Sequence, residues 1–173
     1  LFEYLIFLQK KNKKILVEKP VVLESKKISD FIKKYPDNKV VPALNRLYFP
    51  SVSTLRKILE KKKITSANFS FTEWTEKINH KIYEKKVLSK WGISNSIHVI
   101  YTIFDLIGYP KVLETFTGGK KKIKWHSSGS IFLGSGISER NIPFTYHSDW
   151  TSAGRWGIKI NTDEGTFILE PME

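Results

Sequence analysis

The residues Ile15-Leu16-Val17, followed by Glu18-Lys19-Pro20, constrain the fold more than any other part of the chain. Three apolar residues without polar alternation predict a short buried strand of the kind found in parallel sheets. Pro20 cannot donate a hydrogen bond to a neighbouring strand, so the strand has to end before it. Glu18 and Lys19 are therefore expected at the carboxyl end of that strand, where ligands bind in open α/β sheets. The alternative is an ordinary strand-to-loop boundary with a solvated ion pair.

The segment Glu18-Lys19-Pro20 resembles the Glu-Lys-Pro signature of the glucose–fructose oxidoreductase, inositol dehydrogenase and rhizopine catabolism (Gfo/Idh/MocA) family. In that family the lysine stands beside the nicotinamide ring of NAD or NADP and beside the substrate hydroxyl. The resemblance implies that Lys19 is catalytic and contacts the substrate. It also implies that Glu18, Lys19 and Pro20 lie on the cofactor-binding side.

The first 50 residues predict alternating helices and strands: helix 1–11, strand 14–18, helix 25–35 and strand 39–44. This order is typical of a parallel sheet, here the second half of a nucleotide-binding domain. Asn45 and Arg46 follow the second strand and are expected at the same sheet edge as Lys19. The family often has an arginine and a proline here before a helix, so both residues are cofactor-binding candidates. A capping or surface role for Arg46 is the alternative.

After a helix at 50–62 the pattern changes to alternating apolar and polar residues, which predicts a half-buried strand from about residue 64. Residues 73–90 are polar and charged, and we interpret them either as a loop over an active-site mouth or as a mobile loop. A helix is expected at 91–108. It is followed by strands at 111–117, 123–126, 130–134, 143–150, 155–162 and 166–170.

The expected fold class is α/β: the end of a Rossmann-like parallel sheet, then an α+β domain with a large, mostly antiparallel open sheet. The expected domains are residues 1–50, the C-terminal part of the NAD(P)-binding Rossmann-like domain, and 51–173, an α+β domain for substrate binding and oligomerisation that is expected to be incomplete at its C-terminus. Because apolar residues occur on both faces of the later strands, each face of the sheet needs a cover. We expect helices on one face and a second copy of the chain, in a homo-oligomer, on the other.

The helix at 91–108 carries the second group of candidate residues. Ser94-Asn95-Ser96-Ile97-His98 resembles the family stretch that supplies an acid and, four residues later, a histidine. A four-residue step places both side chains on one helix face. The resemblance implies that His98 is catalytic and that Ser94, Asn95 and His98 contact the substrate. A buried core histidine is the alternative. Two departures from the family, Ser94 in place of its acid and Tyr101 in place of its aspartate, favour a non-catalytic relative.

The composition argues against several other classes. The chain has 29 Lys and Arg against 17 Asp and Glu, but the lysines are scattered and few arginines accompany them, so no nucleic-acid partner is expected. No apolar run is long enough for a membrane span. The absence of cysteine excludes disulfides and thiolate sites and fits a cytoplasmic protein. His80, His126 and His147 lack metal-ligand spacing, so no metal site is expected.

No glycine-rich turn follows a strand and opens a helix. Gly118-Gly119 and Gly134-Ser135-Gly136 lack that context. The resemblance therefore implies a fragment whose phosphate-binding turn lies upstream of Leu1, and which is inactive by itself.

The function that the resemblance implies is NAD(P)-dependent hydride transfer to or from a sugar or nucleotide-sugar-like polyol, with Lys19 and His98 assisting proton transfer. A non-catalytic relative that senses sugar or NAD, or serves in assembly, is the first alternative. A basic nucleic-acid-binding domain is the second.

Overall fold

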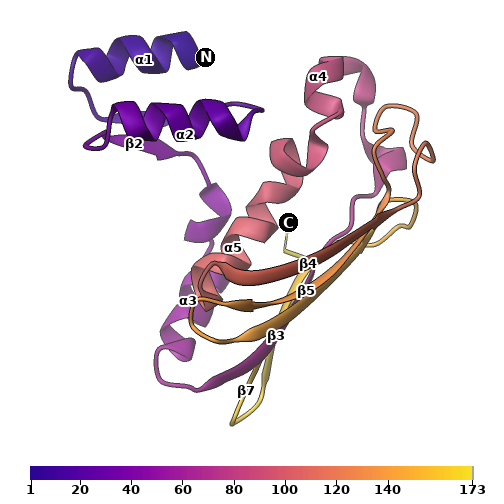
Figure 1. Ribbon diagram of the computed structural model, residues 1–173. Coiled ribbons are helices and arrows are strands. Elements are labelled where there is room, and N and C mark those ends of the chain that lie inside the picture. Colours follow the sequence, from indigo (N-terminus) through magenta and orange to yellow (C-terminus); the bar gives the residue numbers. More distant parts are fainter. Residues whose placement is uncertain (173) are drawn as a thin grey trace. The chain divides into compact units, whose positions relative to one another are not determined.

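The computed structural model describes residues 1–172 and divides the chain into two compact units, Leu1–Asn45 and a second that begins at Arg46 (Figure 1). The first unit consists of α1 (Phe2–Lys10), β1 (Ile15–Val17), α2 (Ser25–Lys34) and β2 (Val40–Pro42). β1 and β2 pair in parallel, with Ile15 opposite Val40 and Val17 opposite Pro42. Such a pair needs a crossover, which α2 provides.

The first unit has a small core on one face of its two strands. Leu5 and Phe31, from α1 and α2, are buried together with Ile15 and Val17. Leu16 points to the opposite face and is 77% exposed. Within residues 1–172 Leu16 is therefore not buried as the strand prediction expects, because the helices of this unit cover only the face of Ile15 and Val17.

The second unit packs helices on one face of a six-stranded sheet. Its helical segments are η1 (Asn45–Tyr48, which starts on the last residue of the first unit), α3 (Pro50–Leu59), η2 (Thr75–Lys77), η3 (His80–Ile82), α4 (Lys85–Leu88), η4 (Gly92–Ser96) and α5 (Ile97–Ile107). The strands are β3 (Ile64–Phe71), β4 (Pro110–Gly118), β5 (Ile131–Ser138), β6 (Pro143–Asp149), β7 (Trp156–Thr162) and β8 (Thr166–Leu169). They lie in the order β4-β5-β6-β3-β7-β8.

β3 is central in this sheet, parallel to β6 and antiparallel to β7, while the other pairs are antiparallel. A short parallel sheet followed by a large, mostly antiparallel one confirms the expected fold class. No helix within residues 1–172 combines the length and the apolar character that a bilayer span requires.

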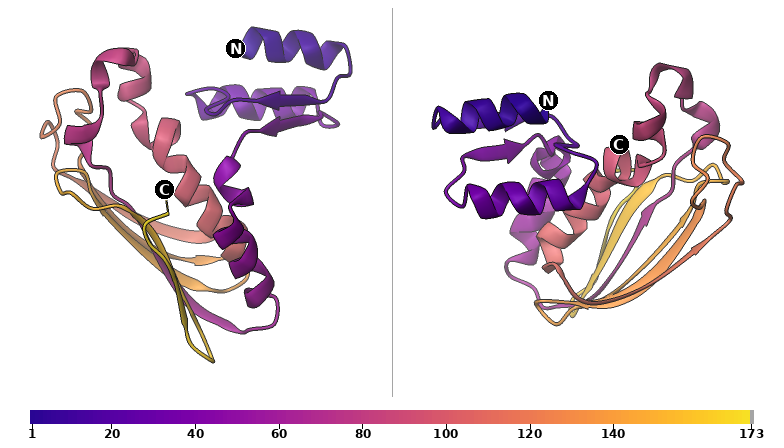
Figure 2. Two further views of the ribbon diagram at one scale, coloured as in Figure 1. Left: turned by 180° about the vertical axis from the view of Figure 1, so that it is seen from behind. Right: turned by 45° about the horizontal axis from the view of Figure 1, so that its top comes forward.

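Helix α5 lies across one face of the sheet (Figures 1 and 2). An aromatic layer fills the space between them: the ring of Phe69 on β3 lies 5.6 Å from that of Phe104 on α5, which lies 5.1 Å from Phe144 on β6. Gly108 ends α5 with a φ of 88°, as its position in the sequence predicts. Arg56 on α3 pairs with Asp105 on α5 at 2.7 Å, so the two helices are also joined at their surface.

The strands after α5 differ from the prediction at two places. The expected strand at 123–126 is a turn closed by a single bridge between Ile123 and His126. β5 continues through Gly134 and Gly136, where the sequence suggested a strand ending at residue 134. A Cβ on Gly136 would lie 2.1 Å from the Val112 carbonyl oxygen and 2.6 Å from the Phe144 ring. These glycines are there because neighbouring groups occupy the side-chain space, and not because the chain turns.

We predict that Gly136→Ala lowers the free energy of unfolding of the second unit by about 1–3 kcal/mol, because the backbone of β4 would have to move. Ser135→Ala, one residue away with its side chain on the other face, should change it by less than about 0.5 kcal/mol. Urea unfolding followed by tryptophan fluorescence measures the effect, since all five tryptophans lie after residue 45. Equal stability of both variants would contradict the close contact.

Candidate functional site

The carboxyl edge of the β1–β2 pair gathers four of the predicted site residues in the first unit. Glu18, Lys19 and Pro20 directly follow β1. The backbone pairing extends one residue past β2, since the Ala43 N–H donates to the Val17 carbonyl at 2.8 Å. Asn45, two residues further, therefore leaves from the same edge. This is the edge at which parallel sheets bind nucleotides, so the four positions fit a dinucleotide cofactor.

Arg46 begins the second unit and carries an unsatisfied donor. Its guanidinium lies 4.6 Å from the ring centroid of Phe49. Its Nε atom is buried and has no hydrogen-bond partner among residues 1–172. Since buried donors are nearly always paired, such an atom indicates a place for a ligand acceptor. Arg46 thus also fits the predicted role in cofactor binding.

The other predicted residues lie where a π-helical turn, η4, runs into α5. Such turns are frequent at functional sites. His98 on the first turn of α5 is buried, and its ring lies 6.2 Å from that of Trp156 on β7, tilted by 38°. Ser94 is buried and donates to the Val87 carbonyl at 3.3 Å. Tyr101 lies further along α5 against Tyr109, at a ring distance of 5.9 Å.

Asn95 is held by a carboxylate that is not among the residues predicted from the sequence. Its Nδ2 atom lies 3.1 Å from both oxygens of Glu73, which comes two residues after β3. Glu73 Oε1 also accepts hydrogen bonds from Ser96 Oγ at 2.7 Å and from Trp156 Nε1 at 3.2 Å. Glu73 is only 6% exposed. The available signal is an acid directly after an alternating strand, at the start of the polar and charged segment 73–90.

Burial raises the pKa of the Glu73 carboxyl above its ordinary value, and the hydrogen bonds from Ser96, Asn95 and Trp156 partly oppose that rise in pKa. Trp156 connects this carboxylate with the histidine, because its indole N–H donates to Glu73 while its ring lies against His98. The second unit therefore brings together Asn95, His98 and the carboxylate of Glu73. Ser94, which stands at the position of the family's acid, has no carboxylate to contribute.

The three remaining histidines lie apart from this group. The Nδ1 atom of His126 is 2.8 Å from the Gly129 carbonyl oxygen, His147 is exposed on β6, and His80 is exposed in η3. Within the described residues 1–172 no three His, Asp or Glu side chains cluster as metal ligands would.

No protein-family model matches the sequence, and no curated protein sequence matches it. Solved structures share its fold. A myo-inositol dehydrogenase from Corynebacterium glutamicum matches with a TM-score of 0.76 and 12% identity over 97% of this chain and 52% of that one. The WlbA dehydrogenase from Bordetella pertussis, in complex with NADH and UDP-GlcNAcA, matches with a TM-score of 0.77 and 11% identity over 97% and 51%.

A levoglucosan dehydrogenase in complex with NADH and L-sorbose matches with a TM-score of 0.76 and 14% identity, over 96% of this chain and 50% of that one. The chain thus spans about half the length of these structures. The predicted resemblance to dehydrogenases of the Gfo/Idh/MocA type is confirmed at the level of the fold.

The buried carboxylate predicts a specific pH dependence. A carboxyl whose pKa is raised by folding holds its proton more tightly in the folded state, so its contribution to stability falls as the pH rises through that raised pKa. We expect Glu73→Gln to gain stability relative to the unsubstituted protein as the pH rises from 4.5 to neutrality. The glutamine oxygen can keep the acceptor position of Oε1.

Urea unfolding at a series of pH values measures this difference. Glu73→Ala should lose about 3 kcal/mol, since it leaves buried donors unpaired. Glu76→Gln removes an exposed carboxylate nearby and controls for net charge. A difference between Glu73→Gln and the unsubstituted protein that is constant with pH would contradict the raised pKa.

Proposed function

We propose that this chain belongs to the Gfo/Idh/MocA family and forms part of an NAD(P)-dependent oxidoreductase that acts on the CH–OH group of a sugar or nucleotide-activated sugar. The observation that carries the proposal is the position of Lys19 directly after the first of two parallel strands, in a chain that shares a dehydrogenase fold over nearly all of its length. The sugar and nucleotide-sugar ligands of two structural neighbours support the substrate class.

Bound NAD or NADP would supply the hydride acceptor or donor. Glu18, Pro20, Asn45 and Arg46 would hold it, with Arg46 Nε donating to one of its oxygens. Lys19 would donate a hydrogen bond to the reacting hydroxyl oxygen and stabilise the negative charge that develops there as its proton leaves. His98 would accept or return that proton.

Asn95 would orient the substrate. Its Nδ2 atom is occupied by both oxygens of Glu73, so its Oδ1 atom points away from that carboxylate as an acceptor for a sugar hydroxyl. Ser94 would contact the substrate less directly, because its hydroxyl already donates to Val87. Glu73 is in this proposal a positioning residue, which fixes both Asn95 and the indole of Trp156 against His98.

Lys19→Ala is the test of the catalytic assignment. The protein expressed from its complete reading frame should bind NADH or NADPH, as followed by nicotinamide fluorescence, and should oxidise or reduce a member of a panel of free and nucleotide-activated sugars. The substitution should lower turnover by about 100-fold or more while changing the cofactor Kd by less than about threefold.

Lys33→Ala, on the exposed side of α2 in the same unit, is the matched control. Unchanged turnover in Lys19→Ala would refute the assignment. No binding of either cofactor would instead favour a non-catalytic relative, the alternative that Ser94 and Tyr101 in place of the family's acids support.

A homo-oligomer formed through the open face of the sheet is also part of the proposal. Val112 and Phe116 on β4 lie opposite Ile137 and Leu133 on β5, so all four share the face away from α5. Val112 is 50%, Phe116 60% and Ile137 42% exposed. An apolar strip on neighbouring strands is suited to a second copy of the same surface.

Phe116→Asp should shift the protein to a smaller species in size-exclusion chromatography with light scattering, because the charge would be buried in the interface. Thr115→Asp places the same charge one residue away on the other face and should leave the oligomer intact. A monomer already present without substitution would contradict the proposed interface.

A further inference from the structure

The second unit contains a large cavity whose lining begins at Trp74, the residue after Glu73. It has a volume of about 1210 Å³ and is formed by three parts of the chain that are distant in sequence: residues 74–89, the β4–β5 connection at 122–125 and residues 151–153 after β6. Binding sites for small molecules commonly measure roughly 300–1,000 Å³. The cavity can therefore hold a ligand larger than a single sugar.

Lysines dominate its charge. Lys81, Lys85, Lys122 and Lys124 line the cavity, against Glu76 as the one lining carboxylate. None of the four lysines has an ion pair within residues 1–172. Four ammonium groups facing one open space raise each other's electrostatic energy, and an anion of two or more charges relieves that repulsion.

Aromatic rings supply the other half of the lining. Trp74, Tyr83 and Trp125 all border the cavity. Two of them are fixed from behind by the buried Trp91, whose ring lies 5.1 Å from that of Tyr83 and 5.6 Å from that of Trp125, both edge to face. Rings held in this way offer a rigid surface on which a planar base can stack.

The β4–β5 connection places its two lysines by a local alternation. Ile123 is 7% exposed and lies between Lys122 and Lys124, which are both exposed. Ile123 thus anchors the segment in the core while its neighbours extend into the cavity. Trp74, which lines the cavity, directly follows Glu73, the carboxylate that holds Asn95.

We infer that this cavity binds the nucleoside diphosphate part of the substrate, with the lysines on the diphosphate and the aromatic rings on the base. The inference rests on the proposed function and deepens it: the substrate is a nucleoside-diphosphate sugar, and its sugar extends past Trp74 toward Asn95 and His98. A free sugar has neither the charge nor the planar ring that this lining fits.

The test is calorimetric titration of the protein expressed from its complete reading frame with UDP, inorganic pyrophosphate and uridine as separate probes. UDP should bind, more weakly as salt rises, pyrophosphate should bind more weakly than UDP, and uridine should bind least. The double variant Lys122→Ala/Lys124→Ala should weaken UDP binding by at least about tenfold, the effect of losing charge-assisted contacts. Trp74→Ala should weaken binding of UDP more than that of pyrophosphate.

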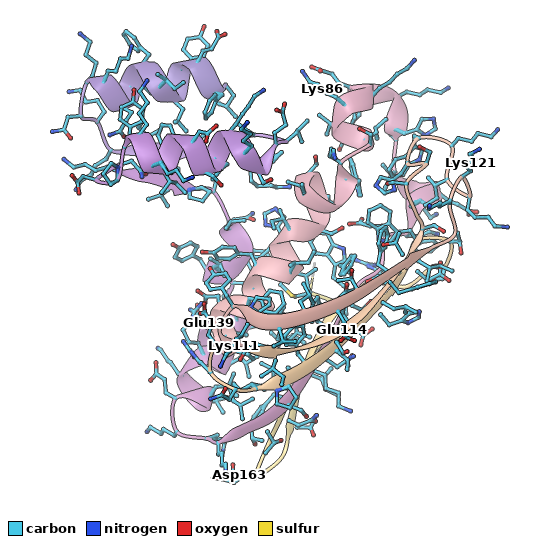
Figure 3. The ribbon with its side chains drawn as sticks, viewed as in Figure 1. Lys86, Lys111, Glu114, Lys121, Glu139 and Asp163 are labelled. Atoms are coloured by element: carbon cyan, nitrogen blue, oxygen red, sulfur yellow. The ribbon has the colours of Figure 1, made fainter. Side chains whose placement is uncertain are left out.

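Lys86 and Lys121 are matched controls. They neighbour Lys85 and Lys122 in sequence, extend outward at the same end of the sheet in Figure 3, and do not line the cavity. The double variant Lys86→Ala/Lys121→Ala should keep the UDP affinity within about twofold. Circular dichroism and tryptophan fluorescence verify that each variant is folded.

The inference would be overturned by no binding of UDP, or by equal weakening in the control pair, which would indicate diffuse attraction between a basic protein and any polyanion. Tighter binding of a single-stranded RNA oligonucleotide than of UDP would overturn it as well. UDP binding in a protein that binds no nicotinamide cofactor would refute the oxidoreductase and leave the cavity assigned. Turnover of free sugars without UDP binding would refute only the cavity.

Discussion

A carboxylate removed from water has to be surrounded by donors, and in the second unit this requirement ties three separate parts of the fold together. Glu73 stands just after β3, its partners Asn95 and Ser96 belong to the π-helical turn before α5, and Trp156 begins β7. The carboxylate can be buried only if all three parts are in place. The same requirement fixes the position of α5 over the sheet, and with it the surroundings of His98.

The π-helical turn η4 carries two of the donors in this arrangement. Asn95 and Ser96 are consecutive residues, and consecutive residues of a regular helix point about 100° apart. Both nevertheless bond the same carboxylate, Ser96 at Oε1 and Asn95 at both oxygens. The wider turn of η4 and the length of the asparagine side chain accommodate both contacts. A local irregularity of the helix thus serves a polar group that would otherwise be unsatisfied.

Much of the fold could be predicted from short-range chemistry. Pro20 has no N–H to donate to a neighbouring strand, so the strand before it has to end and the position of Lys19 follows from the sequence. The end of α5 at Gly108 follows from the sequence in the same way. Glu73 could not be recognised, because its donors lie more than 20 residues away and only the folded chain brings them together. The exposure of Leu16 was missed for a similar reason: burial of a strand residue depends on which elements cover its face.

The cavity could not be predicted from the sequence either, because its lining residues come together only in the folded chain. Nothing in the sequence distinguishes its lysines from the others. Lys81 and Lys85 belong to a charged stretch, and Lys122 and Lys124 belong to a turn whose alternating polar and apolar residues predicted a strand. Their proximity comes from the pairing of β4 with β5, which brings the 122–125 connection to the end of the sheet where residues 74–89 also lie.

Gly134 and Gly136 have a consequence for how such sequences are compared. Atoms of Tyr146, Phe144 and the Val112 carbonyl occupy the space of their missing side chains, whereas Ser135 between them faces the other way. Selection for this packing would preserve the sequence pattern Gly-x-Gly within a strand. Between a strand and a helix, the same pattern is part of a phosphate-binding turn. Pattern searches that ignore the neighbouring aromatic residues would therefore confuse a packing contact with a nucleotide site, and the rings of β6 are the feature that separates the two.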